Sequence, residues 1–323
     1  MSEQMSRRGL LRRLAETGLA AAGVSGAAIW LHGRQPRGTA APPAPVSSFR
    51  VDAAAGAPRM VIARGTRPGP LVDAALEEMG GIERFIAKGD TVLVKPNAAF
   101  DRPAWQGTTT NPDVLGAVVA ACRRAGAAEV LVTDNPIHAP EGCFRKTGLG
   151  RATEDAGGKV LLPRPSDFGP VALPGTILDG WSVYLEPLLR ANKVIGIAPV
   201  KDHNLALASL TLKNWYGLLG GPRNRLHQRM DETIADLAAL VRPTFSVLDG
   251  TRILLRNGPT GGSPDDVVAG DVIALCTDGV ALDAFGATLL SRTADDLDYL
   301  RLAEEKGRGT RDWRSLDPRE ISL

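Results

Sequence analysis

The chain has 323 residues, of which 44% are hydrophobic, and it carries 38 basic and 36 acidic side chains. This length and apolar content suffice for a large core, which excludes a disordered or fibrous protein. Six Arg and two Glu lie in residues 1–40, so the remainder holds 32 basic and 34 acidic side chains; without a basic block we expect no nucleic acid partner.

In chain order, the first feature is an N-terminal segment typical of export. Ser6, Arg7 and Arg8 precede Gly-Leu-Leu, and an apolar stretch follows over residues 19–31. This arrangement resembles a twin-arginine signal, and the stretch is shorter than the roughly 20 residues that span a bilayer. We therefore predict a signal peptide over residues 1–40 that engages the twin-arginine (Tat) translocase.

Residues 41–58 are rich in Pro and Ala, and small residues near Ala40 suit cleavage. They predict a linker between the signal and a single α/β domain over residues 59–323. The mature protein is then expected in the periplasm or another extracytoplasmic compartment. The alternative is a signal that stays uncleaved, in which case the N-terminal segment would be the membrane contact.

The predicted domain alternates between two kinds of segment. Continuous apolar runs typical of buried parallel strands occur at residues 59–65, 90–97, 128–136, 158–163, 192–203, 245–250 and 271–279. Helical patterns occur at residues 71–79, 112–126, 144–157, 185–192, 231–242, 279–290 and 294–307. The alternation predicts a layered α/β fold with a mostly parallel central sheet and helices on both faces.

Residues 205–219 fit two descriptions. Leucines at positions 205, 207, 210 and 212 nearly alternate, as in a strand, whereas Leu205, Ala208 and Leu212 also share one face of a helix. We expect a helix or a partly helical hairpin that ends at Gly220 and Gly221.

Polar side chains recur where the predicted strands end. They are Lys95, Asn97, Asp134, Lys201, His203, Asp249 and Asp278. In open parallel sheets, ligands bind beyond the carboxyl ends of the strands. A solvated loop or a helix cap explains each residue taken alone, and Asp278 would be a good N-cap for the helix after it. Their recurrence at several strand ends predicts a shared polar site.

The loop "GTTTN" at residues 107–111 lies just before a predicted helix. Asn111 would cap that helix and Pro112 suits its first position, which explains the loop without a ligand. Hydroxyls and free backbone N–H groups at a helix N-terminus also bind anions, so Thr109 is a candidate ligand-binding residue.

Cationic residues in these segments predict a pocket for a carboxylate or phosphate ligand. Lys95, Lys201, Lys213 and Arg223 would supply the positive charge. The expected ligand-binding residues are Lys95, Asn97, Thr109, Asp134 and Asn214, and the expected catalytic residues are His203, Lys213 and Lys201. His203 is the candidate general acid or base. The alternative is a purely structural network, in which Asp134, Asp249, Asp278 and Asp283 neutralise the lysines.

A divalent metal is a second candidate ligand. His138, His203 and His227 all lie in polar segments, and His227 with Asp249 or Asp278 would supply metal ligands. No His-x-His or His-Glu-x-x-His spacing supports such a site.

The cysteines argue against an iron–sulfur cluster. Cys122, Cys143 and Cys276 include no Cys-x-x-Cys pair, so we expect no cluster. Cys122 and Cys276 lie in apolar runs typical of a core, which leaves Cys143 as the more accessible thiol.

Taken together, several motifs resemble the family called domain of unknown function 362 (DUF362). They are "VKPN", "TTTNP", "VTDN", "PVKDH", "LTLKNWYG", "RNRLH", "VLDG", "NGPTGG" and "TDGVALDA", in the family's order over residues 60–306. Some members look like iron–sulfur proteins through added ferredoxin-type Cys motifs, which this chain lacks. The family has no assigned activity, so the resemblance implies site residues and no reaction. The matched positions are Lys95, Pro96, Asn97, Asp134, Lys201, His203, Lys213, Asn214, Gly217, His227, Asp249, Gly258, Pro259, Asp278 and Asp283.

The sequence therefore predicts an exported protein whose polar Lys/His/Asp/Asn pocket binds an anionic small molecule, with a divalent metal as a further candidate. Acid, base and cationic groups in one site favour an enzyme. The alternative is a non-catalytic metal-binding or redox accessory protein of the cell envelope.

Overall fold

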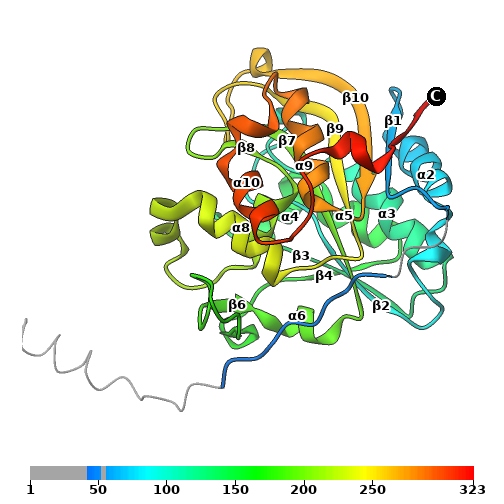
Figure 1. Cartoon of the computed structure of the whole chain (residues 1–323). Helices are drawn as coiled ribbons and strands as arrows, with labels where there is room; N and C mark the ends of the chain where they lie inside the picture. Colours follow the sequence, from blue (N-terminus) through cyan, green and yellow to red (C-terminus); the bar gives the residue numbers. More distant parts are fainter. Residues whose placement is uncertain (1–41, 52–55) are drawn as a thin grey trace, which may run out of the picture. The chain divides into compact units, whose positions relative to one another are not determined.

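The centre of the fold is a mixed, mostly parallel sheet (Figure 1). Its strands are β1 (Met60–Arg64), β2 (Thr91–Lys95), β3 (Glu129–Thr133), β4 (Lys159–Leu161), β7 (Lys193–His203), β8 (Leu207–Ser209), β9 (Phe245–Leu254), β10 (Val267–Cys276) and β11 (Arg319–Ser322). The strand order is β11-β1-β10-β9-β7-β2-β3-β4, and β8 pairs with β7. A separate antiparallel pair is formed by β5 (Phe168–Pro170) and β6 (Ser182–Tyr184). The predicted fold class is confirmed.

A computed structural model describes residues 42–51 and 56–323 of the chain. The predicted signal peptide over residues 1–40 lies outside the described residues, as do residues 41 and 52–55 of the predicted linker. Residues Pro43–Leu323 form one compact unit. Within the described ranges, no helix has the length and apolar character needed to span a bilayer.

Part of the predicted linker packs on the domain. Ala44 forms a β-bridge with Val171. Phe49 is buried, and its N–H donates to the carbonyl of Arg242 at 2.9 Å. The Pro/Ala-rich composition indicates an extended backbone, but it does not show that the side chain of Phe49 packs in the core.

Helices cover both faces of the sheet. One face is covered by α2 (Pro68–Glu78), α3 (Pro112–Arg124), α4 (Pro140–Lys146) and α5 (Leu149–Asp155), and the other by α6 (Leu185–Arg190), α7 (Thr211–Asn214), α8 (Met230–Leu240), α9 (Gly279–Leu289) and α10 (Asp298–Glu305). Figure 1 shows α2 and α3 on one side of the strands and α8 and α10 on the other. Successive strand residues alternate between the two cores: Val92 and Val94 belong to one, and Leu93 to the other.

The predicted helix at residues 144–157 is two helices in the structure. Gly148 separates α4 from α5 and has a φ of 80°. A side chain strongly disfavours this left-handed backbone, so glycine permits the break.

One strand direction differs from the expectation. The apolar run at residues 271–279 was predicted as another parallel strand, but β10 pairs antiparallel with both β1 and β9. At the end of β10, Cys276 lies opposite Ser246 at the start of β9. Asp278 is therefore at the opposite edge of the sheet from the carboxyl ends of β2, β3, β7 and β9, and the prediction that it joins them is wrong. A strand covered on both faces is continuously apolar in either direction, so its pattern cannot show the direction.

The strand β7 extends past its neighbour and forms one wall of a site. β2 pairs with β7 only as far as Gly196, whereas β7 continues to His203. Beyond that point the extension pairs with β8, with Lys201 opposite Ser209. Residues 205–219 thus form a hairpin strand followed by α7 and a 3-10 turn (Trp215–Leu218), in agreement with a partly helical hairpin.

Candidate functional site

A cavity of about 660 Å³ lies where the carboxyl ends of β2 and β3 meet the β7–β8 hairpin and α7. The predicted site residues that line it are Lys95, Asn97, Asp134, Lys201, His203, Lys213, Asn214 and His227. These residues come from five separate segments of the chain, and the topology of the sheet brings them together. Thr109, Asp249 and Asp278 do not line this cavity.

A buried ion pair forms the floor of the cavity. Lys95 Nζ lies 2.7 Å from Asp134 Oδ1, and both side chains are at most 2% exposed. The other carboxylate oxygen of Asp134 accepts the N–H of Ala98 at 2.7 Å. Burial lowers the pKa of Lys95, and the charge of Asp134 opposes that shift. Because Asp134 is satisfied by Lys95 and backbone donors, its charge is largely committed to the protein itself.

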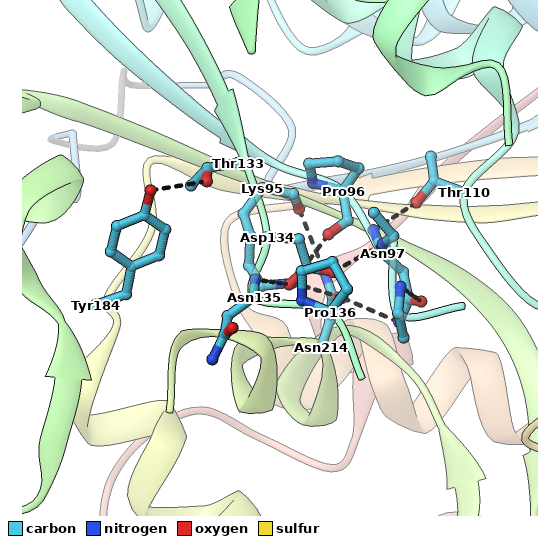
Figure 2. A network of polar contacts seen from close by, with 12 residues as sticks. Lys95, Pro96, Asn97, Thr110, Thr133, Asp134, Asn135, Pro136, Tyr184 and Asn214 are labelled. Carbon is cyan, nitrogen blue, oxygen red and sulfur yellow. Dashed lines mark hydrogen bonds and ion pairs between the residues drawn. The ribbon is translucent and has the colours of Figure 1, made fainter. Parts of the chain in front are cut away.

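Asn214 of α7 connects the end of β2 to the middle of β7. Its Nδ2 donates to the carbonyls of Lys95 and Ile197, both at 3.2 Å. Its Oδ1 accepts from Lys95 Nζ at 3.1 Å and from Asn97 Nδ2 at 3.3 Å (Figure 2). The side chain therefore positions Lys95 and Asn97 at the cavity wall, and its hydrogen-bonding groups are occupied by protein.

Lys201 differs from Lys95 in having only neutral partners. Its Nζ donates to the carbonyl of Thr108 at 2.6 Å and to Asn97 Oδ1 at 3.5 Å. None of the described carboxylates forms an ion pair with it. Burial, reinforced by the charge of Lys213, lowers the pKa of Lys201 to about 7. This amine therefore exchanges its proton near neutral pH.

Lys213 is the least engaged cation in the cavity. Within the described ranges its Nζ makes no hydrogen bond or ion pair, and it lies 5.3 Å from the centre of the Tyr216 ring. Burial and then the charge of Arg223 lower the pKa of Lys213 to about 8. An ammonium group without a partner in a cavity is well suited to meet an anion.

The position of Lys213 depends on Asp283 of α9. Asp283 Oδ1 accepts the N–H of Thr211 at 2.7 Å, and Oδ2 accepts the N–H of Leu212 at 3.0 Å. The hydroxyl of Thr211 also donates to Oδ1. These backbone donors are the first of α7, so a fully buried carboxylate from another helix fixes the start of the helix that carries Lys213 and Asn214.

His203 is arranged as a hydrogen-bond donor. Its Nδ1 accepts the N–H groups of Leu205 at 3.1 Å and Ala206 at 3.2 Å, so the ring proton lies on Nε2. Burial and then the charges of Lys213 and Lys201 lower the pKa of His203 to about 2. A neutral ring with Nδ1 occupied offers its Nε2–H as a hydrogen-bond donor to a ligand.

Arg223 adds a further positive charge at the cavity wall. Its guanidinium donates to the carbonyls of Asn135 and Pro136, both at 2.8 Å. Burial lowers its pKa. Of the described residues that line the cavity, Asp134 is the sole acidic one, against Lys95, Lys201, Lys213 and Arg223. The wall is thus strongly cationic.

The three predicted metal ligands do not meet. Asp249 lies inside β9, which continues to Leu254, and its carboxylate accepts the N–H of Asn111 at 2.7 Å. Asp278 caps α9 by accepting the N–H of Val280 at 3.0 Å, so the prediction that it is an N-cap is confirmed. His227 lies exposed at the cavity, with its ring centre 5.7 Å from that of Tyr216. In residues 42–51 and 56–323, no three His, Cys, Asp or Glu side chains lie close enough together to hold a metal ion.

Thr109 lies in the loop before α3 and away from the cavity lining. Its buried hydroxyl has no hydrogen-bond partner among the described residues. Asn111 Oδ1 accepts the N–H of Asp113 at 3.1 Å, as expected for the cap of α3. Through the carbonyl of Thr108, this loop supports Lys201.

Two further residues singled out in the sequence, Cys143 and His138, lie away from the cavity lining. Cys143, expected to be the accessible thiol, is fully buried, and Cys122, Cys143 and Cys276 are all free thiols. His138 lies outside the cavity, where its Nδ1 is 2.6 Å from Asp101 Oδ1.

Part of the cavity wall is apolar, which was not predicted from the sequence. Ile137, Leu205 and Tyr216 line the cavity beside the cations. A signal was present for Ile137, because it is a single large apolar residue in an otherwise polar loop after a strand. Leu205 was considered only as part of a strand or helix pattern at residues 205–219, and such a pattern does not indicate a ligand site.

The sheet and the cavity define an α/β protein with a cationic site at the carboxyl ends of its parallel strands. The family model described as domain of unknown function (DUF362) matches residues 92–288, which is more than half of the chain, so the chain belongs to this family. A thylakoid-associated protein of Synechocystis is 26% identical over 222 residues, covering 64% of this chain and 65% of that protein. The chain thus matches slightly less than two thirds of this relative's length.

The solved structures that match are more distant. The lactate racemase apoprotein of Thermoanaerobacterium thermosaccharolyticum has a TM-score of 0.38 and 14% identity, covering 75% of this chain and 60% of that one. A protein of Thermotoga maritima has a TM-score of 0.37 and 13% identity, covering 76% of this chain and 60% of that one.

Proposed function

We propose that the chain is an enzyme that binds an anionic small molecule in the cavity at the strand ends. The observation that carries this proposal is the charge of the wall, in which four cationic side chains face one carboxylate that is already paired. Lys213 has no hydrogen-bond or ion-pair partner among the described residues and would bind the anion directly. Arg223 and the Nε2–H of His203 would add hydrogen bonds.

The catalytic part of the proposal rests on the two amines. A group exchanges protons with a substrate most effectively when its pKa lies near the working pH. Lys201, with a pKa of about 7, and Lys213, with a pKa of about 8, both meet this condition. Lys201 would act as the proton acceptor or donor, and strongly shifted pKa values cluster at catalytic sites.

Binding is tested by calorimetry with phosphate, sulfate and simple carboxylates. Lys213→Gln should weaken anion binding roughly 10- to 100-fold, as expected for the loss of one charge-assisted contact. Lys146→Gln is the matched control, because Lys146 is an exposed lysine that pairs with Asp101 outside the cavity. If no anion binds, or if both variants bind as the wild type does, the proposal is wrong.

Turnover is tested separately with pools of small carboxylates and phosphates, followed by mass spectrometry. Lys201→Met should abolish any conversion that the wild type performs, with anion affinity retained within a fewfold. Conversion by Lys201→Met at the wild-type rate would remove Lys201 from the reaction.

The alternative is a metal-binding or redox accessory protein. It predicts a stoichiometric metal in protein purified from its own host, and loss of that metal in His227→Ala. Metal content measured before and after chelation separates the two functions, because an anion site without a metal keeps its affinity after chelation.

We also propose export by the twin-arginine route. The support is the Ser6-Arg7-Arg8 motif and the apolar stretch that follows it. The Synechocystis relative is named as thylakoid-associated, which supports a location near a membrane system. Replacement of both arginines by lysine should leave the chain in the cytosolic fraction; if the variant is still exported, this route is not used.

A further inference from the structure

Two large apolar side chains lie exposed at the cavity. Ile137 is 65% exposed and Leu205 is 54% exposed, and both line the cavity. Single exposed apolar residues are common on protein surfaces. These two, however, come from different loops, one after β3 and one in the β7–β8 turn, and they border the same space.

The cavity therefore has two chemically distinct parts. Lys95 and Lys201 are at most 2% exposed, so the positive charge lies deep, whereas Ile137 and Leu205 lie at the mouth. The Tyr216 ring also lines the cavity and lies next to Lys213. A ligand that fills the space would place charge inward and hydrocarbon outward.

The size of the cavity also bears on the ligand. A volume of about 660 Å³ falls within the range of about 300–1,000 Å³ that holds drug-sized ligands. Phosphate or acetate alone would leave most of it to water. Water at the mouth would then contact the apolar surfaces of Ile137 and Leu205, which a hydrocarbon group covers more favourably.

We infer that the cavity takes an amphipathic anion, with its carboxylate or phosphate near Lys213 and its alkyl or aryl part against Ile137 and Leu205. The inference rests on the proposed function and deepens it by naming the class of ligand. The positive charge of Lys213 in the cavity and the apolar side chains at its mouth together carry the inference.

The test is a series of straight-chain carboxylates from acetate to octanoate, titrated below their micelle-forming concentrations. Affinity should increase with each methylene, by up to about fourfold. Ile137→Ser and Leu205→Ser should reduce this increase while leaving acetate affinity unchanged. Leu189→Ser is the matched control, because Leu189 is 60% exposed and does not line the cavity. Alkylammonium ions of the same lengths should not bind.

The outcomes separate the inference from the proposed function. If short anions bind but affinity does not change with chain length, the inference fails and the proposed function stands. If no anion of any length binds, both fail. Sedimentation with phosphatidylglycerol vesicles distinguishes a free amphiphile from a lipid surface. Vesicle binding that depends on Leu205, without length-dependent binding of free carboxylates, would overturn the inference in favour of a membrane contact.

Discussion

The carboxylate of Asp134 lies directly against the Cα of Gly217, leaving no room for a side chain between them. A Cβ at Gly217 would overlap Asp134 Oδ1 and would lie 2.8 Å from Lys95 Nζ. The carbonyl of Gly217 also accepts the N–H of Asn135 at 2.8 Å. The turn after α7 and the loop after β3 thus meet at the buried ion pair.

Gly217→Ala should therefore displace the ion pair. We expect a loss of about 1–3 kcal/mol in the free energy of unfolding, since the neighbouring side-chain atoms are buried and held in the ion pair. Anion affinity should fall as well, because Lys95 shifts at the cavity floor. Gly69→Ala is the control, since nothing lies within 4 Å of its Cβ position in α2. Urea denaturation measures the stability of the two variants, and equal stabilities would contradict the described contact.

The Lys95–Asp134 pair should be costly to break from one side. Lys95→Met leaves the Asp134 carboxylate buried without its cation, and we expect a loss of about 3–5 kcal/mol of stability. The double variant Lys95→Met/Asp134→Leu should be less destabilised than the sum of the two single variants, because no unpaired charge remains. Strict additivity in a double-mutant cycle would show that the two side chains do not interact.

Anion binding should weaken as the pH rises through the pKa values of Lys201 and Lys213. Lys201 and Lys213, with pKa values of about 7 and about 8, lose their charges over this range. The Kd for sulfate or a carboxylate, whose own charge is constant over this range, should increase from about pH 6 to about pH 9. Calorimetry on the wild type and on Lys201→Met measures this, and the variant should lose the part of the dependence near pH 7. A Kd that is constant with pH would show that neither amine contacts the anion.

Lys201 should also make the free energy of unfolding depend on pH. The folded-state pKa of Lys201 is about 7, below its ordinary value of 10.5. Between these values the unfolded chain holds more protons than the folded chain, so the contribution of Lys201 to stability increases with pH over this window. Below pH 7 the burial penalty of the charged amine is present in full. The wild type should therefore gain free energy of unfolding relative to Lys201→Met as the pH rises. A difference between the two that is constant with pH would contradict the lowered pKa.

Asp283→Asn should impair the site from a distance. Asparagine keeps the shape but replaces one acceptor oxygen with a donor facing the N–H groups at the start of α7. We expect anion affinity to fall severalfold because Lys213 shifts, together with about 1–3 kcal/mol of lost stability. Thr211→Val removes only the hydroxyl contact and should have the smaller effect. An unchanged Kd in a destabilised Asp283→Asn variant would limit Asp283 to a structural role.

The sequence alone was enough for the α/β class and for most of the residues around the cavity. Continuous apolar runs between helical patterns require a sheet covered on both faces, and this pattern depends only on local periodicity. Lys95 and Asp134 directly follow or end such runs, so the rule for the ends of parallel strands brings them together. Lys201 and His203 were found for the same reason, and Lys213 was found by its charge and by the family motif "LTLKNWYG".

Tertiary structure alone decided the direction of β10 and the partners of each charge. Asp278 lies away from the site because β10 runs antiparallel, and the sequence of an apolar run does not show the direction of its strand. Asp249 lies inside β9 and not at its end, and its carboxylate accepts a hydrogen bond from the N–H of Asn111. Whether a lysine is paired, as Lys95 is, or unpaired, as Lys213 is, depends on which side chains from distant segments come within a few ångströms. Such distances arise from packing between segments, and the local order of residues does not contain them.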